Sequence, residues 1–85
     1  MSKSVISVVI PLFNKERYIH RALESVLVQS FQNFEIVVVN DGSTDNGYEI
    51  VKNFRDARIR LIDQKNAGVS AARNRGINES KSDFI

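Results

Sequence analysis

The sequence predicts an α/β fold in which helices flank a mostly parallel sheet. Segments with the unbroken apolar pattern of buried strands alternate along the chain with segments of helical periodicity. The connections between successive strands are too long for hairpins and have the length of crossover helices. The 85 residues suffice for one small domain, without an internal repeat or a low-complexity tract. We therefore expect the order β-α-β-α-β-α-β, with right-handed crossovers.

The first strand is expected at residues 5–10, where nearly every side chain is apolar. Pro11 should end this strand, because proline cannot donate a hydrogen bond to a sheet ladder. Asn14 offers a side-chain cap for a first helix, which should lie on the sheet and end near Gln29 or Ser30. The apolar residues at helical spacing in this helix are Ile19, Ala22, Leu23, Val26 and Leu27.

The stretch at residues 34–45 is the centre around which the chain is organised. Its β-branched run at residues 36–39 suits a strand that is buried on both faces. The sequence Asn40-Asp41-Gly42 ends the strand as a turn, because glycine tolerates positive φ and Asx side chains bond nearby backbone N–H groups. Asp41 is thereby held at the C-terminal edge of a central strand, where open α/β sheets bind ligands.

The second half of the chain continues the alternation. A helix is expected at about residues 44–54, with Gly47 on its inward face. Charged and apolar residues alternate at 58–63, which suits a strand near the edge of the sheet. A third helix is expected at about 69–79, and residues 82–85 have the pattern of the opening of a fourth strand.

The predicted sheet-facing row of the third helix contains one anomaly. At helical spacing this row is Val69, Ala72, Arg73, Gly76 and Ile77. A buried guanidinium needs a partner. We therefore expect Arg73 to pair with Asp41 or with an anionic ligand, in preference to extending its long stem to solvent. The sequence thus predicts a small-molecule site at which Asp41 and Arg73 converge on one rim of the sheet.

The composition bounds the classes of function. The chain has no cysteine, so neither a disulfide framework nor a thiolate metal site can form. Twelve basic and ten acidic side chains give a net charge of +2, which is too balanced to indicate nucleic-acid binding. Residues 55–79 hold six basic and three acidic side chains, and such an excess attracts phosphorylated ligands, although most of it should be a solvated face.

The apolar run before Pro11 is too short for a signal segment or a membrane span. We therefore expect a cytoplasmic chain, with peripheral attachment to a membrane left open for a full-length protein.

Several familiar catalytic and nucleotide-binding motifs are absent from the sequence. The turn after the first strand lacks the Gly-x-Gly-x-x-Gly pattern of a dinucleotide site, and no Walker-type lysine loop occurs. His20 is the only histidine and is expected on the surface of the first helix. No serine or cysteine nucleophile has a matching base.

Three segments together resemble the N-terminal, nucleotide-binding part of family 2 glycosyltransferases with the GT-A fold. They are Val-Val-Ile-Pro-Leu-Phe-Asn at 8–14, Ile-Val-Val-Val-Asn-Asp-Gly-Ser-Thr-Asp at 36–45, and Asn-Ala-Gly-Val-Ser-Ala-Ala-Arg-Asn-Arg-Gly at 66–76. Each is moderately specific, and their order and spacing make a strong signal that covers essentially the whole chain. The resemblance implies a truncated, Rossmann-like GT-A nucleotide-binding half, with residues 1–85 as one N-terminal nucleotide-sugar-binding domain fragment.

The resemblance implies a donor site residue by residue. Pro11 and Phe13 would line the pocket for the nucleotide base. Asp41 would accept hydrogen bonds from the uracil or the ribose of a nucleotide-sugar donor. Arg73 would hold the base or the diphosphate, and Lys65 would approach phosphate.

The activity that the resemblance implies is transfer of a sugar from a nucleotide diphosphate donor, often UDP-linked, to a hydroxyl acceptor, as in polysaccharide or glycoconjugate synthesis. Mn²⁺ or Mg²⁺ on the leaving diphosphate would assist the full-length enzyme. In the family an Asp-x-Asp metal motif, the acceptor site and the catalytic base follow the fourth strand, so no metal ligand and no catalytic residue is assigned here. We expect this chain alone to bind donor weakly without turnover, and to self-associate through an uncovered first strand.

Two alternatives stay open. The first is a non-catalytic nucleotide-binding module with the same half-fold, used for interaction; an Asp-x-Asp shortly after Ile85 would favour the enzyme instead. The second and more distant one is a receiver domain like those of response regulators. That class needs an acidic pair after the first strand, and residues 11–14 contain none.

Overall fold

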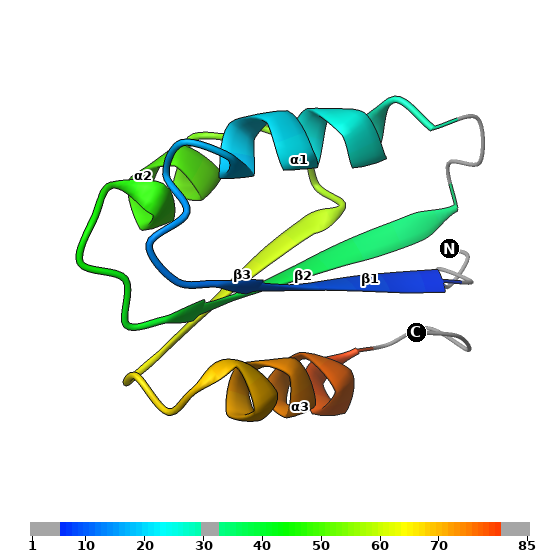
Figure 1. Cartoon of the computed structure of the whole chain (residues 1–85). Coiled ribbons are helices and arrows are strands. Elements are labelled where there is room, and N and C mark those ends of the chain that lie inside the picture. Colours follow the sequence, from blue (N-terminus) through cyan, green and yellow to red (C-terminus); the bar gives the residue numbers. More distant parts are fainter. Residues whose placement is uncertain (1–5, 30–32, 81–85) are drawn as a thin grey trace.

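The computed structural model describes residues 6–29 and 33–80, which form a three-layered α/β unit. The elements follow in the order β1 (Ile6–Leu12), α1 (Ile19–Leu27), β2 (Phe34–Asp41), α2 (Gly47–Lys52), β3 (Ile59–Gln64) and α3 (Val69–Glu79). The strands are parallel, and β2 lies between β1 and β3. Helices α1 and α2 cover one face of the sheet and α3 covers the other (Figure 1). The predicted fold class is confirmed, and the expected fourth strand at 82–85 lies outside the described residues.

β2 is the buried centre of the molecule. All eight of its residues are buried, as its apolar sequence predicts for a strand covered on both faces. Its side chains alternate between the two faces of the sheet. Ile36 and Val38 pack in the larger core beneath α1 and α2. Val37 and Val39 pack against Ala72 of α3, so β2 anchors both layers of helices.

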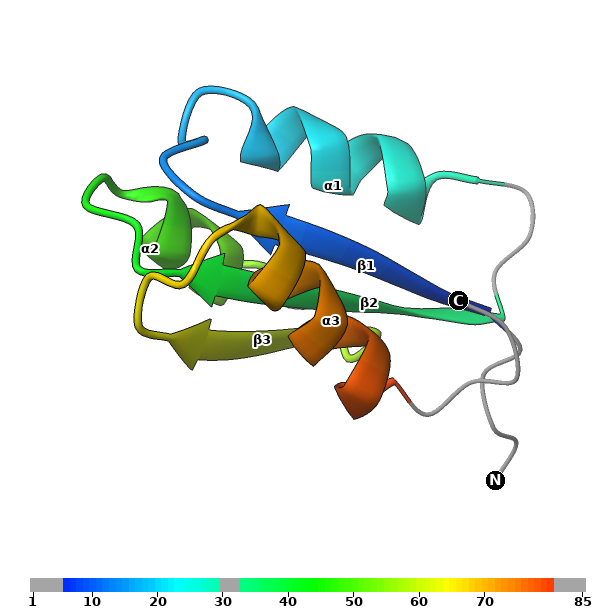
Figure 2. The same ribbon diagram turned by 60° about the horizontal axis from the view of Figure 1, so that its bottom comes forward.

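α3 lies across β1 and β2 on the opposite face (Figure 2). Gly76 allows this helix to approach the sheet closely. A Cβ atom at Gly76 would overlap Cγ1 of Val9 and would lie 3.4 Å from Cγ2 of Val39. Small residues therefore set the distance between α3 and the sheet.

The predicted sheet-facing row of α3 is only partly right. Ala72 and Gly76 are buried, as expected. Val69, Arg73 and Ile77 are exposed, which corrects the expectation that Arg73 lies on the buried face. The reason is geometric. Because Ala72 and Gly76 are small, the helix packs close to the strands, and only a narrow face of it contacts the sheet. The neighbouring positions 69, 73 and 77 lie outside this face.

Two boundaries at the start of the chain also differ from the prediction. Pro11 does not end β1, since the strand continues to Leu12 and Pro11 pairs with Val39. β1 is at an edge of the described sheet, and an edge strand tolerates a proline whose nitrogen faces away from its neighbour. α1 begins at Ile19, and Asn14, predicted as its cap, instead adopts a positive φ of 51°.

The later elements follow the predicted pattern more closely. β3 begins and ends one residue later than predicted and is mostly half-buried, in line with its alternating sequence. α3 spans the predicted residues 69–79. α2 is shorter than the predicted 44–54, because Thr44 and Asp45 bond to the loop after β1 instead of starting the helix. Among the helices of residues 6–29 and 33–80, none has the length and apolar character needed to span a bilayer.

Candidate functional site

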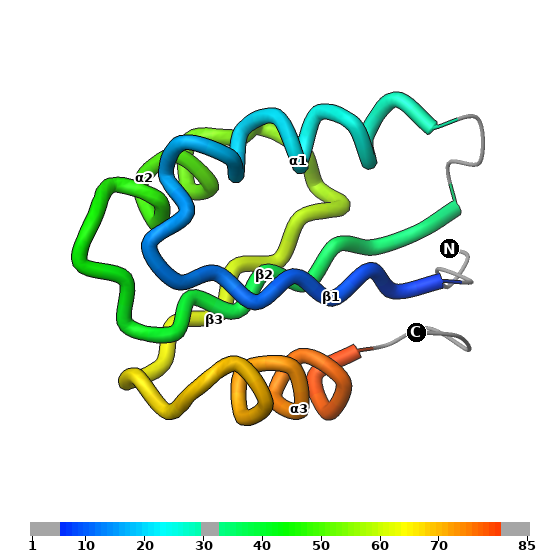
Figure 3. The backbone as a smooth tube through the Cα atoms, viewed as in Figure 1, coloured from blue at the N-terminus to red at the C-terminus, as the bar shows by residue number. Residues whose placement is uncertain are grey.

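The loops that follow the three strands meet at one edge of the sheet (Figure 3). Because the strands are parallel, their carboxyl ends share this edge. A cavity of about 420 Å³ opens there. It is lined by residues of β1 and the loop after it, the end of β2, and the loop that leads into α3: Pro11, Phe13, Lys15, Asp41, Asn66, Gly68 and Val69. We call it the edge cavity.

Asp41 is buried at the edge cavity and holds the loop after β3 around its carboxylate. Oδ1 accepts hydrogen bonds from Nε2 of Gln64 at 2.9 Å and from the backbone N of Ala67 at 2.8 Å. Oδ2 accepts from the backbone N of Gly68 at 3.0 Å and from Nδ2 of Asn66 at 3.3 Å. A carboxylate offers about four lone-pair sites, and Gln64 at the end of β3 and the loop after it together occupy all of them.

These hydrogen bonds lower the pKa of Asp41 below its ordinary value of 3.8. The bond from Gln64 has the largest effect, burial acts in the opposite direction, and the amides of Ala67 and Gly68 lower the pKa further. The ionised carboxylate lies at the N-terminus of α3, where the helix dipole favours negative charge. The charge of Asp41 therefore helps to fix both the loop and the helix that form one wall of the edge cavity.

The described hydrogen bonds of the Asp41 carboxylate do not go to backbone amides of the turn that contains Asp41. The amides that it bonds are 26 and 27 residues further along the chain. It joins the end of one strand to the start of a helix, so a change at this residue should alter the shape of the cavity wall.

The structure brings together three of the five predicted site residues. Pro11, Phe13 and Asp41 all line the edge cavity, and the ring of Phe13 is 45% exposed. Lys65 lines a neighbouring polar hollow instead, on the side of α2 and β3. Arg73 is exposed and lines neither hollow.

The predicted pairing of Arg73 with Asp41 is wrong. The described partners of the Asp41 carboxylate are Gln64 at the end of β3 and polar groups of the loop that follows it. Arg73 lies one helical turn beyond Val69, and residues four apart share a helix face. A contact between Arg73 and a bound nucleotide therefore stays a prediction, based on its distance of one turn from the cavity wall.

Lys15, Gln64 and Asn66 were not named as site residues from the sequence, although residues 64–68 form one of the three loops that the strand order predicts to meet at this edge, with 11–14 and 40–45. Gln64 could have been found from the sheet, because it ends β3 directly beside Asp41 in the parallel register. Lys15 and Asn66 could not, since both lie in loops whose paths depend on contacts with distant residues.

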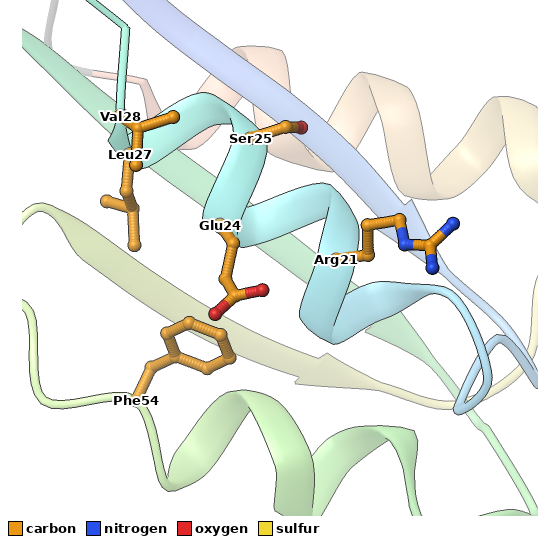
Figure 4. Close-up of a pocket in the computed structure, with 6 residues that line it drawn as sticks. All are labelled: Arg21, Glu24, Ser25, Leu27, Val28 and Phe54. Atoms are coloured by element: carbon orange, nitrogen blue, oxygen red, sulfur yellow. The ribbon is translucent and has the colours of Figure 1, made fainter.

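A second hollow lies between α1 and α2 and has a volume of about 570 Å³. It is lined by residues of α1, its C-terminal end and the end of α2: Arg21, Glu24, Ser25, Leu27, Val28 and Phe54. Its three polar side chains point in different directions and do not converge on a common point (Figure 4). The edge cavity is the better candidate for a polar ligand, because it lies at the carboxyl edge of the parallel sheet and is lined by the buried carboxylate of Asp41, by the exposed Phe13 and by Lys15.

Within residues 6–29 and 33–80, no three His, Cys, Asp or Glu side chains lie close enough together to hold an ion.

The sequence matches the family described as Glycosyl transferase family 2 over residues 7–85. It is similar to the glycosyltransferase GlyA of Streptococcus pneumoniae serotype 4, with 49% identity over 82 residues that cover 94% of this chain and 12% of GlyA. It is also similar to the glycosyltransferase GlyG of the same organism, with 44% identity over 84 residues, 95% of this chain and 28% of GlyG. The chain thus spans less than a third of the length of each of these relatives.

A crystal structure of S. aureus TarS has the same arrangement of strands and helices. Its TM-score with this chain is 0.86 at 31% identity, and the match covers 95% of this chain and 26% of that one. The resemblance seen in the three sequence segments is confirmed, together with the GT-A type of fold that it implied. Since the family match covers nearly the whole chain, the chain belongs to glycosyl transferase family 2.

Proposed function

We propose that this chain is the nucleotide-binding part of a glycosyltransferase. The enzyme would transfer a sugar from a nucleoside diphosphate donor, with UDP-sugars as the first class to test, to a hydroxyl acceptor. The observation that carries the proposal is the edge cavity itself, in which a buried, ionised carboxylate lies near an exposed aromatic ring at the C-terminal edge of a parallel sheet. Family membership supports the same function.

The chemistry of the cavity suits a nucleotide. The exposed ring of Phe13 offers a face on which a base can stack. The carboxylate of Asp41 is an acceptor for a base N–H or a ribose hydroxyl. Lys15 supplies a positive charge for phosphate.

The hydrogen bonds of Asp41 indicate where a ligand would enter. The bond from Nδ2 of Asn66 to Oδ2 is 3.3 Å long, the longest of the four, and the same amide group also donates to the backbone O of Asp41 at 2.9 Å. A ligand donor can therefore replace Asn66 at Oδ2 while Asn66 keeps its other bond. The remaining three bonds would still hold the wall of the cavity.

The proposal can be tested by titrating the full-length protein with UDP, GDP and UDP-sugars. Each titration is done with and without Mn²⁺. We expect the NMR signals of the Phe13 and Asp41 amides to shift on binding, and the Arg73 amide reports whether the helix face beyond Val69 takes part. Asp41→Asn should weaken binding, because an amide cannot accept at both positions. Glu24→Gln, an exposed change on α1, is the matched control and should bind like the wild type.

The outcomes separate the proposed enzyme from its main alternative. Unchanged spectra with every nucleotide would rule out the nucleotide site. Binding without sugar transfer by the protein as its gene encodes it would favour a non-catalytic interaction module instead.

A further inference from the structure

One wall of the edge cavity, at residues 13–16, belongs to neither a strand nor a helix, so its position depends on side-chain contacts. Along this segment the residues alternate in what they touch. Phe13 and Lys15 line the cavity. Asn14 and the backbone of Glu16 bond to the loop that follows β2. The ligand-facing residues are thus held by their immediate neighbours.

Asn14 makes three hydrogen bonds to the loop after β2. Its backbone N donates to Oγ of Ser43 at 3.1 Å, and its Oδ1 accepts from the backbone N and from Oγ1 of Thr44 at 2.8 and 3.2 Å. Its φ of 51° is in the left-handed region, which asparagine adopts more readily than most residues. One residue type therefore meets both the backbone and the hydrogen-bonding requirements of this position.

Asp45 makes the second connection. Its Oδ2 accepts from the backbone N of Glu16 at 3.1 Å, and its Oδ1 accepts from the backbone N of Gly47 at 2.9 Å, at the first residue of α2. Ser43 connects the same loop to β1 and β2. Its Oγ donates to the backbone O of Leu12 in β1 at 3.4 Å, and its backbone N donates to Oδ1 of Asn40 in β2 at 3.3 Å. Residues 13–16 are therefore fixed to β1, β2 and α2 together.

We infer that Asn14 and Asp45 are positioning residues of the nucleotide site. They hold Phe13 and Lys15 at the right place relative to Asp41, and neither of them lines the edge cavity. We name this set of bonds, from Asn14 to Thr44 and from Asp45 to Glu16, the interloop clamp. The inference rests on the proposed function, because it assigns the clamp to nucleotide affinity. Ordering this wall before binding removes an entropic cost that the ligand would otherwise meet.

Three variants at the two positions test the clamp. Asn14→Gly keeps the left-handed backbone accessible and removes the acceptor, so it separates the hydrogen bonds from backbone strain. Asn14→Asp keeps the acceptor and should restore most of the function. Asp45→Asn removes one of two acceptors and should release the amide of either Glu16 or Gly47.

The measurements are the dissociation constants for UDP and GDP and the amide hydrogen exchange of residues 13–16, in the protein as its gene encodes it. We expect Asn14→Gly and Asp45→Asn each to weaken nucleotide binding by roughly tenfold, as the loss of one or two hydrogen bonds would. Exchange at the amide of Glu16 or of Gly47 should become faster in Asp45→Asn. Asn14→Asp should bind within a few-fold of the wild type.

Asn53→Gly is the matched control, since Asn53 is an exposed asparagine at the end of α2, away from the edge cavity. It should bind nucleotides like the wild type. Urea unfolding of every variant identifies any that fail to fold. Because Asn14 and Asp45 make separate hydrogen bonds, their variants test the clamp independently of each other.

Two results bear on the inference in different ways. If Asn14→Gly and Asp45→Asn fold and bind nucleotides as tightly as the wild type, the clamp does not position the site and the inference is overturned. If the wild type binds neither UDP nor GDP, the proposed function fails. Hydrogen exchange then tests only whether the clamp holds residues 13–16 in place. Faster exchange at these residues in the variants supports the clamp, and unchanged exchange refutes it.

Discussion

At the scale of single residues, Asp41 shows how one carboxylate connects three elements. It ends β2, accepts a hydrogen bond from Gln64 at the end of β3, and accepts two more from amides next to the start of α3. Each of these donors is in a part-buried bond, so losing the acceptor would leave it without its partner in the fold. The same atoms that are proposed to bind a nucleotide thus also shape the cavity around it.

Asp41→Asn should therefore destabilise the loop after β3. An amide keeps one acceptor oxygen but places an NH₂ group against either the Gln64 and Ala67 donors or the Asn66 and Gly68 donors. We expect faster hydrogen exchange at the amides of Ala67 and Gly68 and a lower urea midpoint than in the wild type. The exposed change Glu24→Gln should alter neither, and equal exchange in the two variants would contradict the assigned role.

The position of Asp41 could be predicted from sequence, whereas its partners could not. An Asx-Gly turn directly after a fully apolar run indicates a carboxylate at the C-terminal edge of a central strand. The hydrogen bonds, however, join residues 23 to 27 positions apart. They depend on the register of β2 with β3 and on the path of a loop, and neither leaves a local pattern in the sequence. Without knowledge of these donors, the sequence leaves Asp41 without an assigned partner, and Arg73 is then the nearest candidate that helical spacing offers.

At the scale of elements, the periodicity identified the type of every described strand and helix, but contacts between loops decided their boundaries. Asn14 and Thr44 are both good cap residues by type. In the structure they bond each other, so α1 and α2 begin later than the sequence predicts. On α3, two adjacent rows of residues have helical spacing: one holds Ala72 and Gly76, and the other holds Val69, Arg73 and Ile77. The row with the small residues Ala72 and Gly76 faces the sheet because it permits the closer approach.

Gly76→Ala tests this close approach. The added methyl group would overlap Cγ1 of Val9, whose β-branched side chain has little freedom to move. Overpacking of this kind costs about 1–3 kcal/mol, which exceeds the gain of about 1 kcal/mol in helix propensity. We expect a lower free energy of unfolding in urea denaturation.

Two further variants make that result specific. Asn74→Ala, at an exposed position of α3, should be neutral or slightly stabilising. Adding Val9→Ala to Gly76→Ala should recover part of the lost stability, because it removes the overlapped carbon. A Gly76→Ala variant as stable as the wild type would show that α3 does not pack closely against β1.

At the scale of the whole molecule, two carboxylates of the described residues have lowered pKa values, which link stability to acid pH. Asp41 is held by the donors described above, and the hydrogen bonds of Arg58 lower the pKa of Asp56 to about 2. The side chains of Asp56 and Arg58 meet through two contacts, at 2.9 and 2.8 Å. Because both carboxylates bind protons more weakly in the folded chain, their contribution is fully present above the unfolded value of 3.8 and is lost as the pH falls through the folded values.

The free energy of unfolding should therefore decrease as the pH falls from 3.8 towards about 2. Urea denaturation across this range measures it. Asp56→Asn removes one of these two carboxylates with lowered pKa values and should give a shallower decrease. An identical pH profile in Asp56→Asn would show that the contact with Arg58 does not persist in solution.

The placement of α3 has a consequence for synthesis of the protein. Val37 and Val39 face this helix, and α3 is made after every described strand. A nascent chain that has emerged from the ribosome only as far as β3 therefore carries an apolar sheet face that nothing in its own sequence yet covers. Such surfaces recruit chaperones and favour aggregation. A pause in translation that keeps α3 inside the ribosomal exit tunnel would lengthen that exposure, whereas a pause after α3 has emerged would not.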